Sequence, residues 1–294
     1  MQKKGKWFMR VWLIRHGMTK GNKEHRYVGI SDESILSEEW ERLETKADRM
    51  EFHPAIVFVS PARRCIETAM CLFPGLRGSI KSEYATNTGV AVTATAIMAQ
   101  ARWGCQRMAE NADGKNVEQK MVETGAPRLI VVPEFMEMNF GAFEYKTYQE
   151  INADPDPANR AAYQHYIDTN GEAAFPGGES KTAFTKRVCE GFERAVLPVL
   201  RTQDSRLEVS DAGDETTGVH ILREDGSSVE SPALERSPSG GAPSIAIVAH
   251  GGTIMALMER YAEPKKCYFE WSVKPGEGYA MELDLKTEKL IFAR

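Results

Sequence analysis

Long apolar runs are missing from this chain of 294 residues, although 42% of its residues are hydrophobic and 27% are charged. No run approaches the roughly 18 residues that a membrane-spanning helix needs. The first residues are basic, but the apolar stretch after them is shorter than a secretory signal requires and carries an arginine. We therefore expect a soluble, cytoplasmic protein that does not bind a membrane.

Cysteine is scarce. The five cysteines are scattered, and no two of them form a Cys-x-x-Cys pair. This spacing indicates neither a disulfide framework nor a zinc motif, and it favours a reducing compartment. His25, His53, His165 and His220 show no metal-ligand spacing with one another, so we expect structural or surface roles for them. We predict no metal site and no cofactor.

A basic stripe is also absent, so nothing in the chain favours a nucleic-acid partner. The net charge is −5, and residues 203–243 alone hold nine acids and three arginines. This segment is rich in Ser, Gly and Pro, a composition typical of a mobile insertion, and it contains one candidate hairpin around Asp225-Gly226. The rest of the chain carries about +1 by subtraction, so it can tolerate an anionic ligand.

Apolar and amphipathic segments alternate along the chain. Strands are predicted over 11–14, 55–59, 129–132, 245–249, 279–283 and 289–293. Helices are predicted over 37–47, 61–73, 94–108, 148–152, 158–169, 180–200 and 253–261. Ser60-Pro61 has the pattern of an N-cap followed by Pro at the first helical position. The alternation predicts a single α/β domain over 1–294 with a mainly parallel central sheet and insertions at about 75–127 and 203–243.

The most informative segment follows the first strand and reads Arg15-His16-Gly17-x-Thr19-x-x-Asn22. It supplies a cation, an imidazole, a flexible turn, a hydroxyl and an amide, and these polar groups suit phosphate oxygens. The tripeptide alone is weak, since a loop histidine beside an arginine fits it equally well. A second strand-to-histidine junction, His250-Gly251-Gly252, lies more than 200 residues later. Because ligands bind beyond the carboxyl ends of parallel strands, we expect one phosphate site built from both junctions.

Further segments extend this pattern and occur in a consistent order: Ser60–Ala69, Glu137–Glu144, Gly178-Glu179-Ser180 with Arg187, and Val248–Gly252. Together they resemble the motifs of the histidine phosphatase superfamily, also called the phosphoglycerate mutase-like family. The resemblance covers most of the chain outside 75–127 and 203–243. It implies a three-layer α/β/α sandwich and phosphate chemistry without a metal.

The resemblance also implies a role for each polar residue. His16 would attack phosphorus and become a phosphohistidine, with a backbone carbonyl orienting its other ring nitrogen. Arg15 and Arg64 would clamp the phosphoryl oxygens, and His250 would be a further donor to them. Glu137 would protonate the leaving alkoxide and then deprotonate the attacking water.

Secondary contacts to the phosphate are expected from Thr19 and Asn22, with Gly17 and Gly251 allowing the chain to approach it closely. Two choices stay open in this mapping. Arg63 adjoins Arg64, and family spacing favours Arg64 as the inward residue. Glu134 and Glu144 compete with Glu137 for the acid–base role.

Three functions fit these residues. The first is a phosphomonoesterase acting on a small phosphorylated metabolite, nearest to the small phosphatases and the α-ribazole phosphatase-like branch. The second is a cofactor-dependent phosphoglycerate mutase, which has Glu after Arg-His-Gly, where this chain has Met18. The third is a catalytically idle phosphate-binding module. The sequence identifies neither the substrate nor the oligomeric state, a homodimer included, and the 75–127 insertion fits either a lid or a surface extension.

Overall fold

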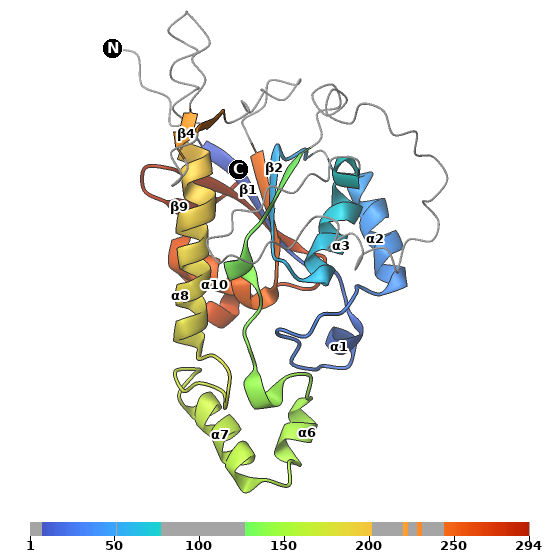
Figure 1. Ribbon diagram of the computed structural model, residues 1–294, viewed down its shortest axis with the longest axis vertical. Helices are drawn as coiled ribbons and strands as arrows, with labels where there is room; N and C mark the ends of the chain where they lie inside the picture. The colour runs from blue at the N-terminus through green and yellow to red at the C-terminus, as the bar shows by residue number, and fades with distance from the viewer. Residues whose placement is uncertain are drawn as a thin grey trace, which may run out of the picture.

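The computed structural model describes residues 8–50, 52–77, 127–201, 220–222, 228–230 and 244–293. A seven-stranded mixed sheet runs through them in the order β3-β2-β6-β1-β8-β9-β7 (Figure 1). Its strands are β1 (Phe8–Arg15), β2 (Ile56–Val59), β3 (Arg128–Val131), β6 (Ser244–Ala249), β7 (Ala262–Glu263), β8 (Gly278–Asp284) and β9 (Lys289–Phe292). Only the β1–β8 and β8–β9 pairs are antiparallel, so the prediction of a mainly parallel sheet is confirmed.

Helices cover both faces of the sheet, which gives the three-layer α/β/α sandwich (Figure 1). One face packs against α2 (Ser37–Ala47) and α3 (Arg63–Leu72), and the other against α8 (Lys181–Gly191) and α10 (Gly251–Tyr261). Successive side chains of each strand point to opposite faces of the sheet, and this alternation produces two hydrophobic cores. Val57 and Val59 of β2 belong to the first core, whereas Phe58 belongs to the second. Burial of each such side chain contributes about 1.5–3 kcal/mol.

The start of α3 differs from its prediction. The sequence places Ser60 as the N-cap, but the helix begins at Arg63 with Ala62 as an N-cap that lacks a side-chain hydrogen bond. The Ser60 hydroxyl accepts from the Ala62 amide only at 3.4 Å, and its shorter contact is to Nε2 of His250 at 2.8 Å. A local capping pattern thus yields here to a contact made by the fold.

Two shorter helices, α6 (Tyr148–Asn152) and α7 (Pro157–Asp168), extend beyond the carboxyl end of the sheet (Figure 1). Both were predicted to within a residue or two. Aromatic packing joins them to the body: the ring centroid of Tyr163 in α7 lies 5.6 Å from that of Phe143 and 5.9 Å from that of Tyr148 in α6. The predicted helix over 180–200 is interrupted by a π-helical turn at Phe192–Val196.

Some predictions fall outside the described residues. These are the helix at 94–108 and nearly all of the 75–127 insertion. Within 203–243, β4 (His220–Leu222) and β5 (Ser228–Glu230) form an antiparallel pair, as expected for the candidate hairpin, and its Asp225-Gly226 turn is not described. Among the helices of the described ranges, none has the length and apolarity to cross a bilayer.

Candidate active site

The two predicted strand-to-histidine junctions meet at the carboxyl ends of β1 and β6, two central strands of the sheet. β1 and β6 are parallel neighbours in which Arg15 is paired with Ala249, and the His16 amide donates to the Ala249 carbonyl at 2.9 Å. The His16 and His250 rings consequently lie 5.2 Å apart between centroids, at an angle of 66°. Both side chains are buried. Residues more than 200 positions apart in sequence therefore share one site.

His16 is oriented by its own turn. Nδ1 lies 2.7 Å from the carbonyl oxygen of Gly17. Since a carbonyl only accepts, Nδ1 carries the proton and Nε2 keeps its lone pair. Burial, followed by the charges of Arg64 and Arg15, holds the pKa of His16 well below its usual 6.5. The Gly17 amide donates to the Thr68 hydroxyl at 2.8 Å, which anchors the turn to α3.

The remaining polar residues of the first motif have partners within the protein. Thr19 and Asn22 form a capping box around α1 (Lys20–Lys23), in which each side chain accepts from the other's amide. A Cβ on Gly17 would lie 2.7 Å from Cγ of Glu39, so glycine here permits close packing against α2. Contact of these three residues with phosphate stays a prediction.

Arg15 has spare hydrogen-bonding capacity beside His16. Its Nη1 donates to the Val273 carbonyl at 2.8 Å, whereas its Nε is buried and has no partner among the described residues. A buried donor left without an acceptor costs about 1–3 kcal/mol. The guanidinium packs on Gly251, where a Cβ would lie 3.3 Å from Cζ of Arg15. An acceptor entering this position would satisfy the orphaned donor.

Arg64 is fully buried and is held from three directions. Nη1 donates to the Ser31 carbonyl at 2.7 Å, and Nη2 donates to the Gly29 carbonyl at 2.8 Å. Nε lies 3.3 Å from Nδ1 of His250. Of its five N–H groups, two are left for another acceptor within the described part of the chain. The adjacent Arg63 instead pairs with the buried carboxylate of Glu67 at 2.7 Å, in keeping with the choice of Arg64.

Glu144 supports Arg64 indirectly. Its Oε1 accepts from the Gly29 amide at 2.8 Å and from the Ser31 amide at 2.9 Å. The same two residues offer their carbonyls to Arg64. The turn at 29–31 is therefore held between a carboxylate and a guanidinium, and Glu144 is committed to this contact.

His250 uses both ring nitrogens within the protein. Nδ1 faces Nε of Arg64, and Nε2 faces the Ser60 hydroxyl. These contacts do not test whether His250 donates to phosphoryl oxygens, so that role stays a prediction. Cys65 is also close, with Sγ 3.6 Å from Nε2 of His250. Burial raises the pKa of the Cys65 thiol to about 12, so this thiol stays protonated and packs as a small buried side chain.

Glu137 reaches the same site from the segment that follows β3. Oε1 accepts from the Met138 amide at 3.0 Å, and Oε2 accepts from the Gly252 amide at 3.1 Å in the first turn of α10. Burial raises the pKa of Glu137, although both amides and the two arginines oppose this shift. Its rival Glu134 instead pairs with Arg194.

Several supporting residues make contacts that were not predicted from the sequence. They are Ser60 beside His250, Thr68 beside Gly17, and the pair Glu179–Arg187 beside the Glu137 segment. All lie inside the motifs noted above, but their partners are remote in sequence. Among the described residues, no three His, Cys, Asp or Glu side chains cluster as metal ligands would. The cationic groups beside both histidines suit an anion instead.

A comparison with known protein families gives a match. The model of the histidine phosphatase superfamily (branch 1) matches residues 11–84 and 119–197, which include His16, Arg64 and Glu137. No curated protein matches the chain.

Solved structures share the fold. The α-ribazole phosphatase from Shigella flexneri aligns with a TM-score of 0.54 and 17% identity, covering 96% of this chain and 94% of the other. YhfR from Bacillus stearothermophilus aligns with a TM-score of 0.53 and 16% identity, covering 97% of this chain and 95% of the other. A mycobacterial glucosyl-3-phosphoglycerate phosphatase gives 0.50 and 17%, covering 96% of each chain.

Proposed function

Because the chain belongs to the histidine phosphatase superfamily, we propose that it is a metal-independent phosphomonoesterase that acts through a phosphohistidine on a small phosphorylated metabolite. One observation carries the proposal: the buried His16 holds its Nδ1 proton on the Gly17 carbonyl at 2.7 Å, beside two arginines with free donors. Attack on a phosphate ester requires a neutral imidazole with a free lone pair and cationic groups around it.

In the first step Nε2 of His16 attacks phosphorus as the ester P–O bond breaks. The transferring group carries negative charge on its oxygens, and the free N–H groups of Arg15 and Arg64 would bind them. The leaving alkoxide takes the proton of Glu137. The raised pKa of Glu137 favours the protonated carboxyl that this step needs.

In the second step the carboxylate of Glu137 removes a proton from water, which attacks the phosphohistidine. The P–N bond breaks, inorganic phosphate forms, and His16 returns to its neutral state. The low pKa of His16 favours its departure without a proton. Glu137 is protonated again, so the site is ready for the next ester.

Hydrolysis rather than phosphoryl exchange is favoured by the first motif, where Met18 stands in place of the glutamate of a mutase. Two similar structures are also named as phosphatases. The proposal places the enzyme in the cytoplasm, with a small phosphorylated substrate rather than a nucleic acid or a membrane as its partner.

The test is hydrolysis of p-nitrophenyl phosphate with and without a chelator, followed by rapid quenching to trap an acid-labile phosphoryl group on the protein. We expect chelator-insensitive turnover and a trapped phosphohistidine. His16→Ala should abolish both, while His165→Ala, at an exposed position of α7, serves as the matched control. Release of phosphate is compared with interconversion of 2- and 3-phosphoglycerate. Dominant interconversion would assign a mutase, and absence of any phosphoenzyme would assign a binding module.

A further inference from the structure

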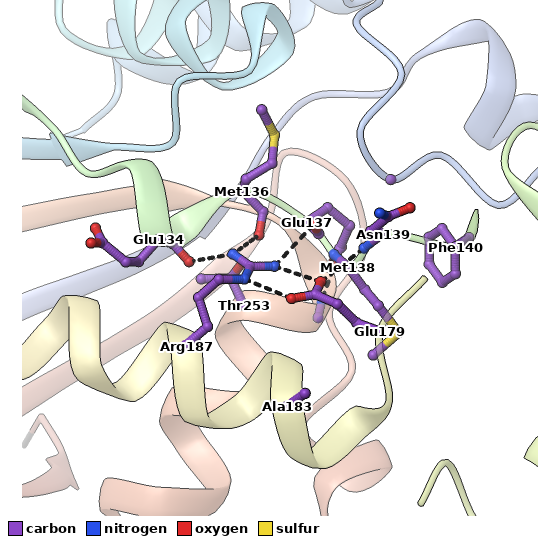
Figure 2. Close-up of polar contacts among 12 residues, drawn as sticks. Glu134, Met136, Glu137, Met138, Asn139, Phe140, Glu179, Ala183, Arg187 and Thr253 are labelled. Atoms are coloured by element: carbon purple, nitrogen blue, oxygen red, sulfur yellow. Dashed lines mark hydrogen bonds and ion pairs between the residues drawn. The ribbon is translucent and has the colours of Figure 1, made fainter. Parts of the chain in front are cut away.

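The side chain of Arg187 extends from α8 to the segment that carries Glu137 (Figure 2). Nη1 donates to the carbonyls of Glu134 at 2.8 Å and Met136 at 3.0 Å. Nη2 donates to the Glu137 carbonyl at 3.4 Å and to the Glu179 carboxylate at 2.8 Å. Nε donates to the other oxygen of Glu179 at 2.8 Å. All five N–H groups of the guanidinium are thereby used, so Arg187 has none to offer a phosphate.

Glu179 holds the other side of Glu137. Its Oε2 accepts from the Asn139 amide at 3.0 Å, and its own amide donates to the Asn139 carbonyl at 2.9 Å. Burial raises the pKa of Glu179, but the hydrogen bonds from Arg187 and the Asn139 amide lower it overall. The pair is therefore ionised, and it grips the main chain before and after Glu137.

This grip matters because the segment has little regular structure of its own. After β3 comes a single 3₁₀ turn at Pro133–Phe135, and the residues from 136 to 140 lie outside any helix or strand. Its carbonyls need partners, which strands or helices would otherwise supply. A guanidinium fork can bridge three carbonyls and a carboxylate at once, whereas an ammonium group cannot reproduce that geometry.

We propose that Arg187 and Glu179 are positioning residues for Glu137: they fix the main chain on both sides of the acid so that its carboxyl meets the leaving oxygen. The inference rests on the proposed function. On this proposal Arg187 and Glu179 serve protonation of the leaving group and do not bind the phosphate. A misplacement of about 1 Å at a reacting group typically costs roughly 10²-fold in rate.

The test uses Arg187→Lys and compares phenyl phosphate with p-nitrophenyl phosphate, whose phenol is a stronger acid and leaves without much help from a proton donor. We expect the first-turnover rate of phenol release to fall roughly 10²-fold for phenyl phosphate and less than about tenfold for p-nitrophenyl phosphate. KM and inhibition by inorganic phosphate should stay within about threefold. Arg194→Lys is the matched control, since Arg194 pairs with the Glu134 carboxylate at the surface, and both rates should be unchanged.

An equal loss for the two esters, no loss, or weaker phosphate inhibition would overturn the positioning role. If Arg187→Lys fails to fold by circular dichroism, Glu179→Gln is judged by the same criteria. Failure of both variants to fold would also overturn it, in favour of a purely structural pair. The proposed function fails separately: in that case the unmodified enzyme forms no phosphohistidine or loses nothing on His16→Ala.

Discussion

Ser60 Oγ lies 2.8 Å from Nε2 of His250, and the contact on the other side of the ring shows which of these two atoms donates. On the opposite side of the ring, Nε of Arg64 lies 3.3 Å from Nδ1. A guanidinium only donates, so Nδ1 accepts and the proton is on Nε2, facing Ser60. His16 has the other tautomer, with its proton on Nδ1. The two histidines of the site are thus held in opposite tautomers by their neighbours.

Ser60→Ala should remove the acceptor of a buried N–H group. We expect the free energy of unfolding to fall by about 1–3 kcal/mol, the cost of a buried donor without a partner, measured by urea denaturation. The ¹⁵N shift of Nε2 of His250 should also change, because its N–H loses the hydroxyl acceptor, while Arg64 keeps the proton on Nε2. Ser34→Ala is the control, since that hydroxyl donates to Glu67 away from the histidines. An unaltered Nε2 shift would show that Ser60 is not the acceptor of this proton.

The pH behaviour of His16 gives a second prediction. Burial and the nearby guanidinium charges disfavour the imidazolium form, so the pKa is lowered and the neutral ring prevails at every pH above it. At pH 6.5, where an unperturbed histidine is about half protonated, His16 should be neutral with its proton on Nδ1. The ¹⁵N spectrum of the ring, titrated downward from pH 8 beside a histidine peptide, measures this directly. A midpoint near that of the peptide would contradict the geometry.

The strands and the two histidine junctions were predictable because their signals are local. Ile245–Ala249 is an apolar run that ends at a polar His250, and the same holds for the strand before His16. Such runs pair as parallel strands, and parallel pairing brings their carboxyl ends together. β7 escaped prediction because two residues, Ala262 and Glu263, carry no periodicity.

The supporting contacts were not predictable, because they join residues that are far apart in the sequence. Ser60 has the local pattern of a helix cap, but its partner is a ring 190 positions away. Arg187 and Glu179 are eight positions apart, whereas the three carbonyls that Arg187 binds belong to another segment. Backbone carbonyls leave no trace in residue identity. A motif can therefore name such residues without saying what they hold.

Two adjacent glycines at the start of α10 provide the third prediction, because a methyl group would meet a different residue at each. At Gly252 a Cβ would lie 2.3 Å from Oε1 of Glu137, so the carboxyl must move. At Gly251 the nearest atoms belong to Arg15 at 3.3 Å, and a small adjustment suffices. Gly252→Ala should lower the first-turnover rate of phenol release from phenyl phosphate roughly 10²-fold, the usual contribution of a displaced acid–base group, and should affect p-nitrophenyl phosphate less.

Gly251→Ala instead changes the surroundings of Arg15, the proposed phosphate ligand, so its effect should fall on KM and should be similar for both esters. The two variants are matched in chemistry, helix position and added volume, and they differ only in the side chain that they press upon. First-turnover rates and KM values for both esters, with thermal melting to verify folding, make the comparison. If Gly252→Ala raised KM equally for both esters without a selective loss of the first-turnover rate for phenyl phosphate, Glu137 would not be the proton donor at this site.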